Sequence, residues 1–185
     1  MNELMKDDDL IDDVISFWFS DEVRPLWFKS TIEFDQLLTT RYEDVWLRAR
    51  AGAYDHWVEE ARSALALVII LDQFPLNMFR QDARQYSTES HAREIARQAI
   101  ETGVDQRLDN EQKAFLYLPF MHSESLEDQK RSLQLYAAAG LQDNLGFAQH
   151  HHDVVERFGR FPHRNKVLGR KSTEQERENL KHANW

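Results

Sequence analysis

The chain has 185 residues, of which 42% are hydrophobic and 11% aromatic, so we expect a folded domain with a sizeable core. It contains no cysteine, which excludes disulfides, thiolate zinc sites and cysteine nucleophiles, and its formal net charge of −9 argues against nucleic-acid binding. Its acidic first residues and its longest apolar run, Ala64–Leu71, fit neither a secretory signal nor a membrane span of about 20 residues, so we expect a soluble cytoplasmic protein.

Helical periodicity predicts three helices in the first half of the chain. Apolar residues at positions i, i+4, i+7 and i+8 form one stripe over residues 10–18, after an acidic start. Ser30 with Glu33 fits a capping box that opens a second helix, which continues through about residue 51. The third helix, over residues 57–73, contains the run ALALVIIL. Because this run is apolar on all sides, we expect the helix to be buried at the centre of the fold.

Further helices are expected in the second half, most of them opened by a capping residue or ended by a glycine. They run from Ser87 or Thr88 to Gly103, from Asp109 to about Leu118, from Ser125 with Asp128 to Gly140, over residues 142–158, and over about 172–184, where Ser172 with Gln175 opens a short polar helix. No segment alternates with period two. The sequence therefore predicts a single all-α domain, residues 1–185, of antiparallel helical hairpins, as in a helical solenoid or an irregular bundle.

A first polar cluster, from Asp72 to Asn77, directly follows the buried third helix. A carboxylate at a helix C-terminus faces the negative end of the helix dipole, and burial adds a desolvation cost. We therefore expect Asp72 to have a cationic partner or a strong hydrogen-bond donor, for which the arginines of residues 157–171 are the candidates. In the alternative interpretation, Asp72 and Gln73 tie the loop backbone together.

A second polar cluster, MHSE, places His122 and Glu124 after the fifth predicted helix. The pKa of a histidine lies near neutrality, so His122 is a candidate proton carrier or metal ligand. The alternative is a histidine that caps the preceding helix. The H-x-E spacing is shared with zinc deaminases, but their signature also needs two cysteines, which this chain lacks.

The third cluster is the basic segment, residues 157–171, which has six cations and no acidic residue in an acidic chain. Its arginines supply forked N–H donors that suit carboxylate or phosphate. The candidate ligand-binding residues in it are Arg160, His163, Arg164, Asn165 and Arg170. The segment is either an anion-binding loop or a network that binds the protein's own carboxylates. The carboxylates considered for such a network are Asp72, Glu124 and Asp128.

Three histidines and an aspartate, His150 to Asp153, precede the basic segment. Consecutive side chains point to different sides of a helix, so these four cannot all bind one metal ion, and we expect no metal site formed by them. His151 shares a face with Val155 and Phe158, which directs it toward the core. His150 and His152 are expected to be exposed.

Three long motifs, in this order and spacing, resemble the bacterial family called domain of unknown function 924. They are ALALVIILDQFP followed by Asn77, FLYLPFMHSE, and HDVVERFGRFPHRN followed by LGR, and the likeness extends from Val14 to about Thr173. The resemblance implies an all-α fold similar to tetratricopeptide-repeat domains, and no established activity. It matches Trp27, Phe28, Asp72, Gln73, Asn77, His122, Glu124, His151, Arg160, His163, Arg164, Asn165 and Arg170. Members usually have arginine where this chain has Leu76, which would alter affinity or specificity if that position contacts a ligand.

The leading functional hypothesis is that the three clusters converge on one groove that binds a small anionic molecule or a chain terminus. Arg160, Arg164 and His163 would hold the anion. Asp72 and Glu124 would orient these cations or bind a ligand amine. Trp27 and Phe28, in a proline-containing loop, would form an apolar wall. Gln73, Asn77, Asn165 and Arg170 complete the expected ligand-binding set.

Two other classes of function stay open at the level of the sequence. In the first, the protein is a protein–protein interaction module, since stacked helical hairpins present peptide-binding surfaces and the polar motifs would then be structural. In the second it is an acid–base or metal-dependent enzyme that uses His122, Glu124 or His163. Exposed motif side chains would favour ligand binding, whereas burial in mutual pairs would favour a structural role. Neither a cofactor nor an oligomeric state follows from the sequence.

Overall fold

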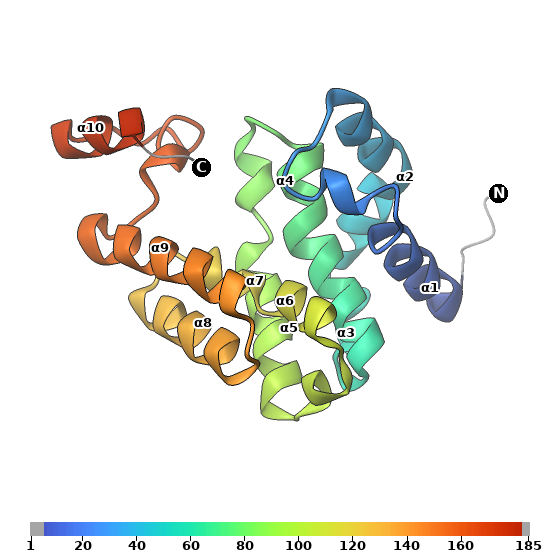
Figure 1. Ribbon diagram of the computed structural model, residues 1–185. Coiled ribbons are helices and arrows are strands. Elements are labelled where there is room, and N and C mark those ends of the chain that lie inside the picture. Colours follow the sequence, from blue (N-terminus) through green and yellow to red (C-terminus); the bar gives the residue numbers. More distant parts are fainter. Residues whose placement is uncertain (1–5, 183–185) are drawn as a thin grey trace.

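The computed structural model describes residues 6–182, in which the chain is helical and contains no strand (Figure 1). The helices are α1 (Asp7–Trp18), α2 (Ile32–Arg50), α3 (Ala61–Val68), α4 (Phe74–Met78), α5 (Glu89–Glu101), α6 (Asn110–Leu116), α7 (Leu118–Met121), α8 (Leu126–Ala138), α9 (Gln142–Phe158) and α10 (Glu174–His182). Short 3-10 turns and one π-helical turn join them. The prediction of an all-α fold is confirmed.

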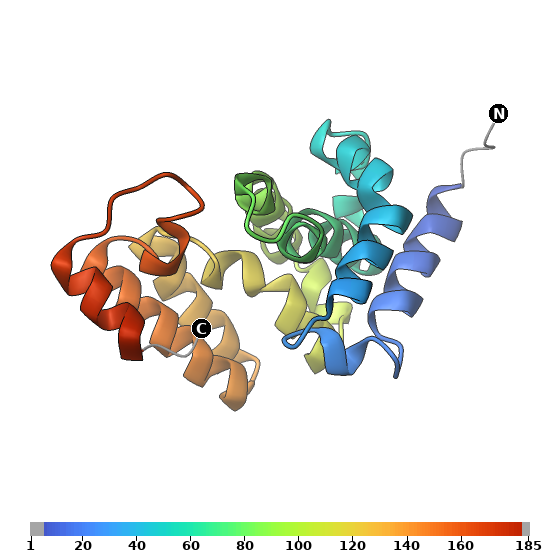
Figure 2. The same cartoon turned by 90° about the horizontal axis from the view of Figure 1, so that it is seen from above.

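The helices are arranged around the short apolar helix α3 and its continuation. Helices α1 and α2 lie on one side of the molecule and the α8–α9 hairpin lies on the other, with α10 beside it (Figures 1 and 2). One apolar core extends from Leu10 to Ala148, and Val154, Val155 and Phe161 form a second, smaller cluster. As predicted, α3 is buried at the centre of the fold: seven of its eight residues are buried, and Arg62 is exposed. No helix in residues 6–182 is long and apolar enough to cross a lipid bilayer.

Two helix boundaries follow the predicted signals closely. Helix α9 spans Gln142–Phe158, and Gly159 ends it with a φ of 68°, a left-handed conformation that glycine adopts without strain. Asp109 opens α6 with a capping box in which the Gln112 N–H donates to Asp109 Oδ1 at 2.9 Å.

Two of the expected capping pairs were assigned one residue too early. Thr31, not Ser30, caps α2, because Thr31 Oγ1 accepts the Phe34 N–H at 3.2 Å. Near α10 the pair is Thr173 with Glu176, not Ser172 with Gln175. The Thr173 N–H donates to the Glu176 carboxylate at 2.7 Å, and the Glu176 N–H donates to Thr173 Oγ1 at 3.2 Å.

The third predicted helix differs most from expectation. It begins at Ala61 rather than Trp57, and it continues beyond Val68 through a π-helical turn, Ile69–Gln73, into α4. Pro75, which has no N–H, cannot bond the Leu71 carbonyl four residues earlier. Thr88 Oγ1 donates to that carbonyl instead. The π-turn is thus held by α4 on one side and by the start of α5 on the other.

Candidate functional site

Asp72 lies in the π-turn and contacts His122, the residue that follows α7. His122 Nδ1 lies 3.1 Å from Asp72 Oδ1 and 3.0 Å from Oδ2, and Gln73 Nε2 donates to Oδ2 at 2.6 Å. The expectation that an arginine of the basic segment pairs with Asp72 was wrong. Its premise was a helix that ends at Asp72, but the helix continues into α4, and the side chain is directed into the interior toward the end of α7.

Arg164 of the basic segment pairs with Glu89, in the first turn of α5. Arg164 Nη1 donates to Glu89 Oε2 at 2.9 Å, and Nη2 donates to the His122 carbonyl, also at 2.9 Å. The guanidinium lies 4.4 Å from the Tyr86 ring centroid and 4.7 Å from that of Phe161. Glu89 is not among the residues expected at the site. The helix dipole by itself favours an acidic residue in a first helical turn. The position of Glu89 in the sequence therefore does not indicate that it has an arginine partner.

We call Asp72, Glu89, His122 and Arg164 the His122 centre. Burial lowers the pKa of His122, but the Asp72 carboxylate and, more weakly, Glu89 outweigh it, and the net shift is upward. Burial raises the pKa of Glu89 against the attraction of Arg164. Each cation of the centre therefore has an acidic partner: His122, whose pKa shift favours its protonated form, contacts Asp72, and Arg164 contacts Glu89.

His122 is the one member of the His122 centre that is not buried. Its side chain is 16% exposed, whereas the side chains of Asp72, Glu89 and Arg164 are 0%, 11% and 7% exposed. Within residues 6–182, no group is hydrogen-bonded to Nε2 of His122, while Nδ1 is held by Asp72. The ring is thus fixed at one nitrogen and open at the other, as in sites where a carboxylate orients a histidine.

Two further histidines, His151 and His163, lie near the His122 centre and are neutral. Burial lowers the pKa of His151 to about 4, and burial together with the charge of Arg164 lowers the pKa of His163 to about 3. Both rings pack on Phe161, with centroid distances of 5.5 and 5.7 Å. The inward direction predicted for His151 is confirmed, since α9 places it against Phe161 rather than in solvent.

Glu124 and Arg170 form a second ion pair beside the His122 centre. Arg170 Nη1 and Nη2 donate to the two Glu124 oxygens at 2.6 and 2.8 Å, and the Phe161 N–H donates to Oε1 at 2.7 Å. Partial burial raises the pKa of Glu124, but these hydrogen bonds outweigh it and lower the pKa overall. Glu124 is therefore an ionised, fully engaged carboxylate at neutral pH.

Arg160 and Asn165 belong to a third cluster, around Glu176 of α10. Arg160 Nε and Nη2 donate to the Glu176 carboxylate at 2.7 and 3.0 Å, and Asn165 Nδ2 donates to it at 3.3 Å. These bonds, with Arg160 the largest cause, lower the pKa of Glu176 to about 2. As with Glu89, the sequence offered no signal beyond an acidic residue in a first helical turn.

The three arginines thus bind carboxylates of the chain itself, as one of the two interpretations predicted. Glu124 was among the carboxylates expected, whereas Asp72 and Asp128 are not used in this way. Asp128 instead accepts Arg93 Nε at 2.9 Å and Ser123 Oγ at 2.7 Å. The basic segment therefore joins α5, the α7–α8 loop and α10 through one arginine each.

Comparison with known proteins places this arrangement in a family. The family described as "Bacterial protein of unknown function (DUF924)" matches residues 14–184. The chain belongs to this family. A solved structure of a protein of unknown function from Agrobacterium tumefaciens is 40% identical, with a TM-score of 0.90, covering 96% of this chain and 100% of that one. The comparison with curated proteins gave no match.

The DUF924 positions that follow Asp72 tie α4 to its surroundings. Asn77 Nδ2 donates to the Gln73 carbonyl at 3.2 Å, and Asn77 Oδ1 accepts Arg80 Nη2 at 3.0 Å. Arg80 also donates to Asp35 at 2.8 Å. Leu76 is half-buried. Asn77 thus binds the local backbone, whereas the Gln73 amide donates to the Asp72 carboxylate and not to the backbone, as the alternative interpretation had expected of it.

Trp27 and Phe28 do not line the His122 centre. Trp27 is half-buried, with its ring centroid 4.6 Å from that of Phe115, and its Nε1 donates to the Trp18 carbonyl at 2.9 Å, whereas Phe28 is 77% exposed. Both border a separate cavity of about 230 Å³ beside α6 and the start of α9. Trp27 and Phe28 therefore do not form the apolar wall that was expected beside the polar motifs, and no hydrogen bond or ring contact joins either to those motifs within residues 6–182.

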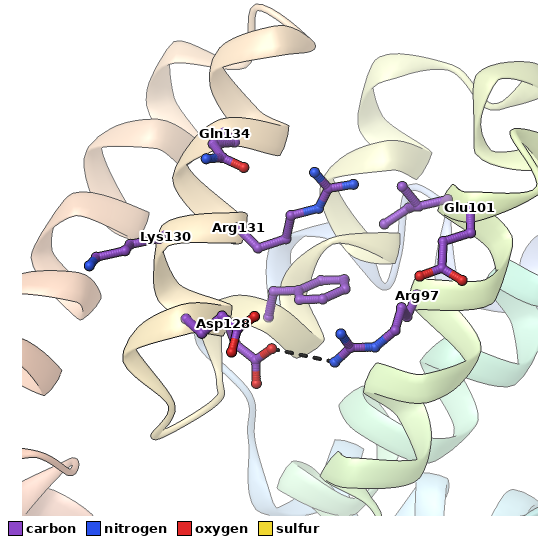
Figure 3. A pocket seen from close by; sticks show the side chains of 9 residues that line it. Arg97, Glu101, Asp128, Lys130, Arg131 and Gln134 are labelled. Carbon is purple, nitrogen blue, oxygen red and sulfur yellow. Dashed lines mark hydrogen bonds and ion pairs between the residues drawn. The ribbon is translucent and has the colours of Figure 1, made fainter.

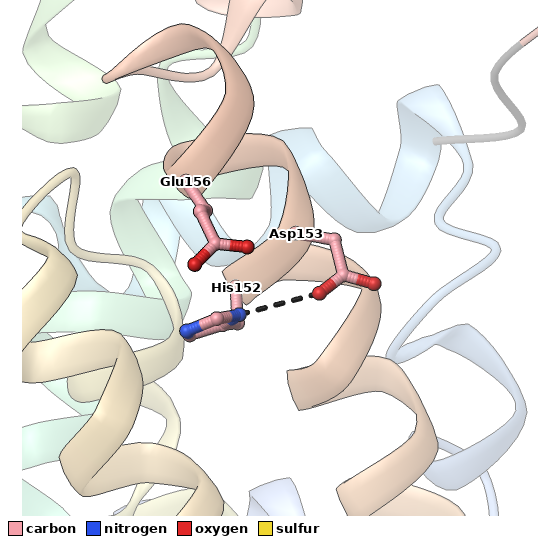
Figure 4. A group of neighbouring side chains, drawn as sticks. All are labelled: His152, Asp153 and Glu156. Atoms are coloured by element: carbon pink, nitrogen blue, oxygen red, sulfur yellow. Dashed lines mark hydrogen bonds and ion pairs between the residues drawn. The ribbon is translucent and has the colours of Figure 1, made fainter.

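One group of three side chains in the described part of the DUF924 chain has metal-ligand spacing: His152, Asp153 and Glu156 of α9, with ligand atoms within 4.8 Å of one another (Figure 4). His152 Nδ1 already lies 3.2 Å from Asp153 Oδ1, which also accepts Gln149 Nε2 at 2.7 Å. His152 is half-buried, contrary to expectation, while His150 is exposed as expected. Two exposed carboxylates that share one helix with a histidine are common on protein surfaces and do not by themselves define a metal site.

Proposed function

We propose that this DUF924 protein binds a small molecule or chain terminus that carries an acidic group, and that His122 Nε2 is the contact that recognises it. The supporting observation is the state of the His122 ring. Its Nδ1 is fixed by a buried aspartate, its pKa is raised, its side chain is 16% exposed, and its Nε2 has no hydrogen-bond partner among residues 6–182. A protonated imidazole held in this way offers one oriented, charge-assisted hydrogen bond to an anion.

The arginines have a different role in this proposal from the one expected of them. Arg160, Arg164 and Arg170 are bonded to carboxylates of the chain, so direct binding of a ligand anion would require these pairs to break. For the buried pair of Arg164 with Glu89, breaking would leave an uncompensated charge, which costs about 3–5 kcal/mol. The arginines are therefore positioning residues: Arg164 holds the His122 carbonyl, and Arg170 holds Glu124.

Acid–base catalysis at this site would depend on His122. Glu124 is bonded to Arg170 and the Phe161 N–H and keeps its charge, and His163, with a pKa of about 3, does not take up a proton near neutral pH. Of the three catalytic candidates, His122 alone combines a nitrogen that no described group bonds with a raised pKa.

A second function class is supported by the burial of Asp72, Arg164 and Asn165, each of which is bonded to another side chain of the protein. In that proposal the motifs are structural. They hold the α8–α9 hairpin and α10 against α5, and the stacked hairpins, similar to tetratricopeptide repeats, present a surface to a protein partner. The two proposals differ in whether His122 contributes anything besides stability.

Thermal unfolding with and without acetate, phosphate or sulfate separates these two proposals. If His122 binds the acidic group, at least one of these anions raises the Tm of the wild type and leaves that of His122→Gln unchanged. His91→Gln is the matched control, because His91 also bonds an aspartate, Asp55 at 2.8 Å, but on the surface. His91→Gln should keep the wild-type response. A wild type that none of the anions stabilises, with His122→Gln merely less stable, would support the structural role instead.

A further inference from the structure

A groove between α5 and α8 is a separate candidate site. It consists of two cavities, of about 440 and 360 Å³, which share Ile100, Arg131 and Gln134. The first cavity reaches along α8 to Glu127 and the second reaches to Ala139 (Figure 3 shows the first). No residue of the His122 centre lines either cavity, so the groove is independent of the function proposed above.

The floor of the groove is apolar on both sides of Arg131. The first cavity contains the buried ring of Phe120, and the second contains Leu135 and the ring of Tyr117, both of which are also buried. Ile100 of α5, half-buried, lies where the two cavities meet. An occupant would therefore cover an apolar surface at each end of the groove.

The cation at the junction is not neutralised by the chain. Arg131 is exposed, and in Figure 3 its guanidinium extends from α8 toward α5; none of the carboxylates in residues 6–182 forms an ion pair with it. The aspartates that border the groove are already engaged. Asp128 accepts Arg93 at 2.9 Å, and Asp105 accepts the Tyr117 hydroxyl at 2.7 Å.

We propose that this groove binds an extended peptide segment in which an acidic side chain lies between two apolar ones. The twelve helical steps from Glu127 of α8 to Ala139, the residue that follows α8, span about 18 Å at a rise of about 1.5 Å each. An extended chain rises about 3.3 Å per residue, so about five residues fill that length, and alternate side chains face the same way. The recognised pattern is apolar–x–acidic–x–apolar, with the acidic side chain on Arg131 and the apolar ones over Phe120 and over Leu135 with Tyr117.

The test uses the blocked peptide Leu-Ser-Glu-Ser-Leu with a fluorescent label, and anisotropy measures its binding to the full chain. The same peptide with Gln at the centre should bind at least about tenfold more weakly, because it loses one charge-assisted contact with Arg131. Arg131→Gln should lose the distinction between the two peptides. Arg157→Gln, an exposed arginine of α9, is the matched control and should keep it. Glu101→Gln, which removes a carboxylate from the opposite wall, should tighten binding.

Amide chemical shifts of the labelled protein locate the bound peptide. Shifts confined to α5, α7 and α8 would support the proposal, and shifts centred elsewhere would overturn it. Equal affinity for the Glu and Gln peptides would also overturn it, as would an Arg131→Gln variant that still distinguishes them. Absence of binding at millimolar peptide would also overturn the proposal, because a groove of this length with a matched charge should bind the peptide with a Kd below the millimolar range.

Discussion

Arg164 is the one buried cation in residues 6–182, and its environment explains how the fold tolerates it. A buried ion pair gains little net stability, because desolvation offsets most of the attraction between the charges, but removing one partner is costly. Arg164→Met keeps most of the volume and leaves the Glu89 carboxylate uncompensated. We expect a loss of about 3–5 kcal/mol in the free energy of unfolding at neutral pH, measured by urea denaturation.

A double variant separates the buried charge from the lost contacts. Glu89→Gln added to Arg164→Met removes the stranded carboxylate, so we expect it to recover a large part of the stability that Arg164→Met loses. Lowering the pH should also shrink the loss of the single variant, because Glu89, whose pKa burial already raises, then takes up a proton. A single variant as stable as the wild type would show that the pair contributes nothing.

At the level of the element, the π-turn Ile69–Gln73 positions Asp72, and Thr88 holds it in place. The Thr88 hydroxyl donates to the Leu71 carbonyl and accepts Trp46 Nε1 at 3.1 Å. Thr88→Val is nearly isosteric but leaves a buried carbonyl and a buried N–H without partners. Each unsatisfied group costs about 1–3 kcal/mol, so we expect Thr88→Val to lose at least about 2 kcal/mol in urea denaturation.

Thr40→Val is the matched control for this variant. The Thr40 hydroxyl also donates to a backbone carbonyl, that of Gln36 at 2.9 Å, but it lies on the exposed side of α2. Water replaces the lost partner there, so we expect a change within about 0.5 kcal/mol. If both variants lose the same amount, the threonine side chain matters for helix propensity and not for the π-turn.

Local signals predicted most helix boundaries, and they failed where distant residues decide the structure. The left-handed Gly159 and the Asp109 capping box act within a few residues, so the sequence shows them directly. The π-turn depends on Pro75 together with Thr88, and the latter belongs to another helix. The site shows the same division. The arginines were found from composition, whereas Glu89, 75 residues before its partner, resembles any acidic residue in a first helical turn.

At the level of the whole molecule, the buried histidines determine how stability depends on pH. His151 and His163 have pKa values of about 4 and about 3 in the folded protein, against about 6.5 in an unfolded chain. Below pH 6.5 the unfolded chain therefore binds more protons at these rings, and the free energy of unfolding falls as the pH falls. His122 acts in the opposite direction. Its pKa is raised, so its contribution is present below about pH 6.5 and is lost as the pH rises through the folded value.

We expect the wild type to be less stable at pH 5 than at pH 7, with His151 and His163 each contributing about 1–2 kcal/mol to the difference. The carboxylates with lowered pKa, Glu124 and Glu176, lose their contributions at more acidic pH and affect this interval little. His151→Gln should reduce the difference in the free energy of unfolding between pH 5 and pH 7 by the contribution of His151, as measured by urea denaturation at each pH. His150→Gln, the exposed neighbour on α9, should leave the difference unchanged. If His151→Gln and the wild type show the same difference in stability between pH 5 and pH 7, His151 has an ordinary pKa in the folded protein. The neutral state assigned to this ring beside the His122 centre would then be wrong.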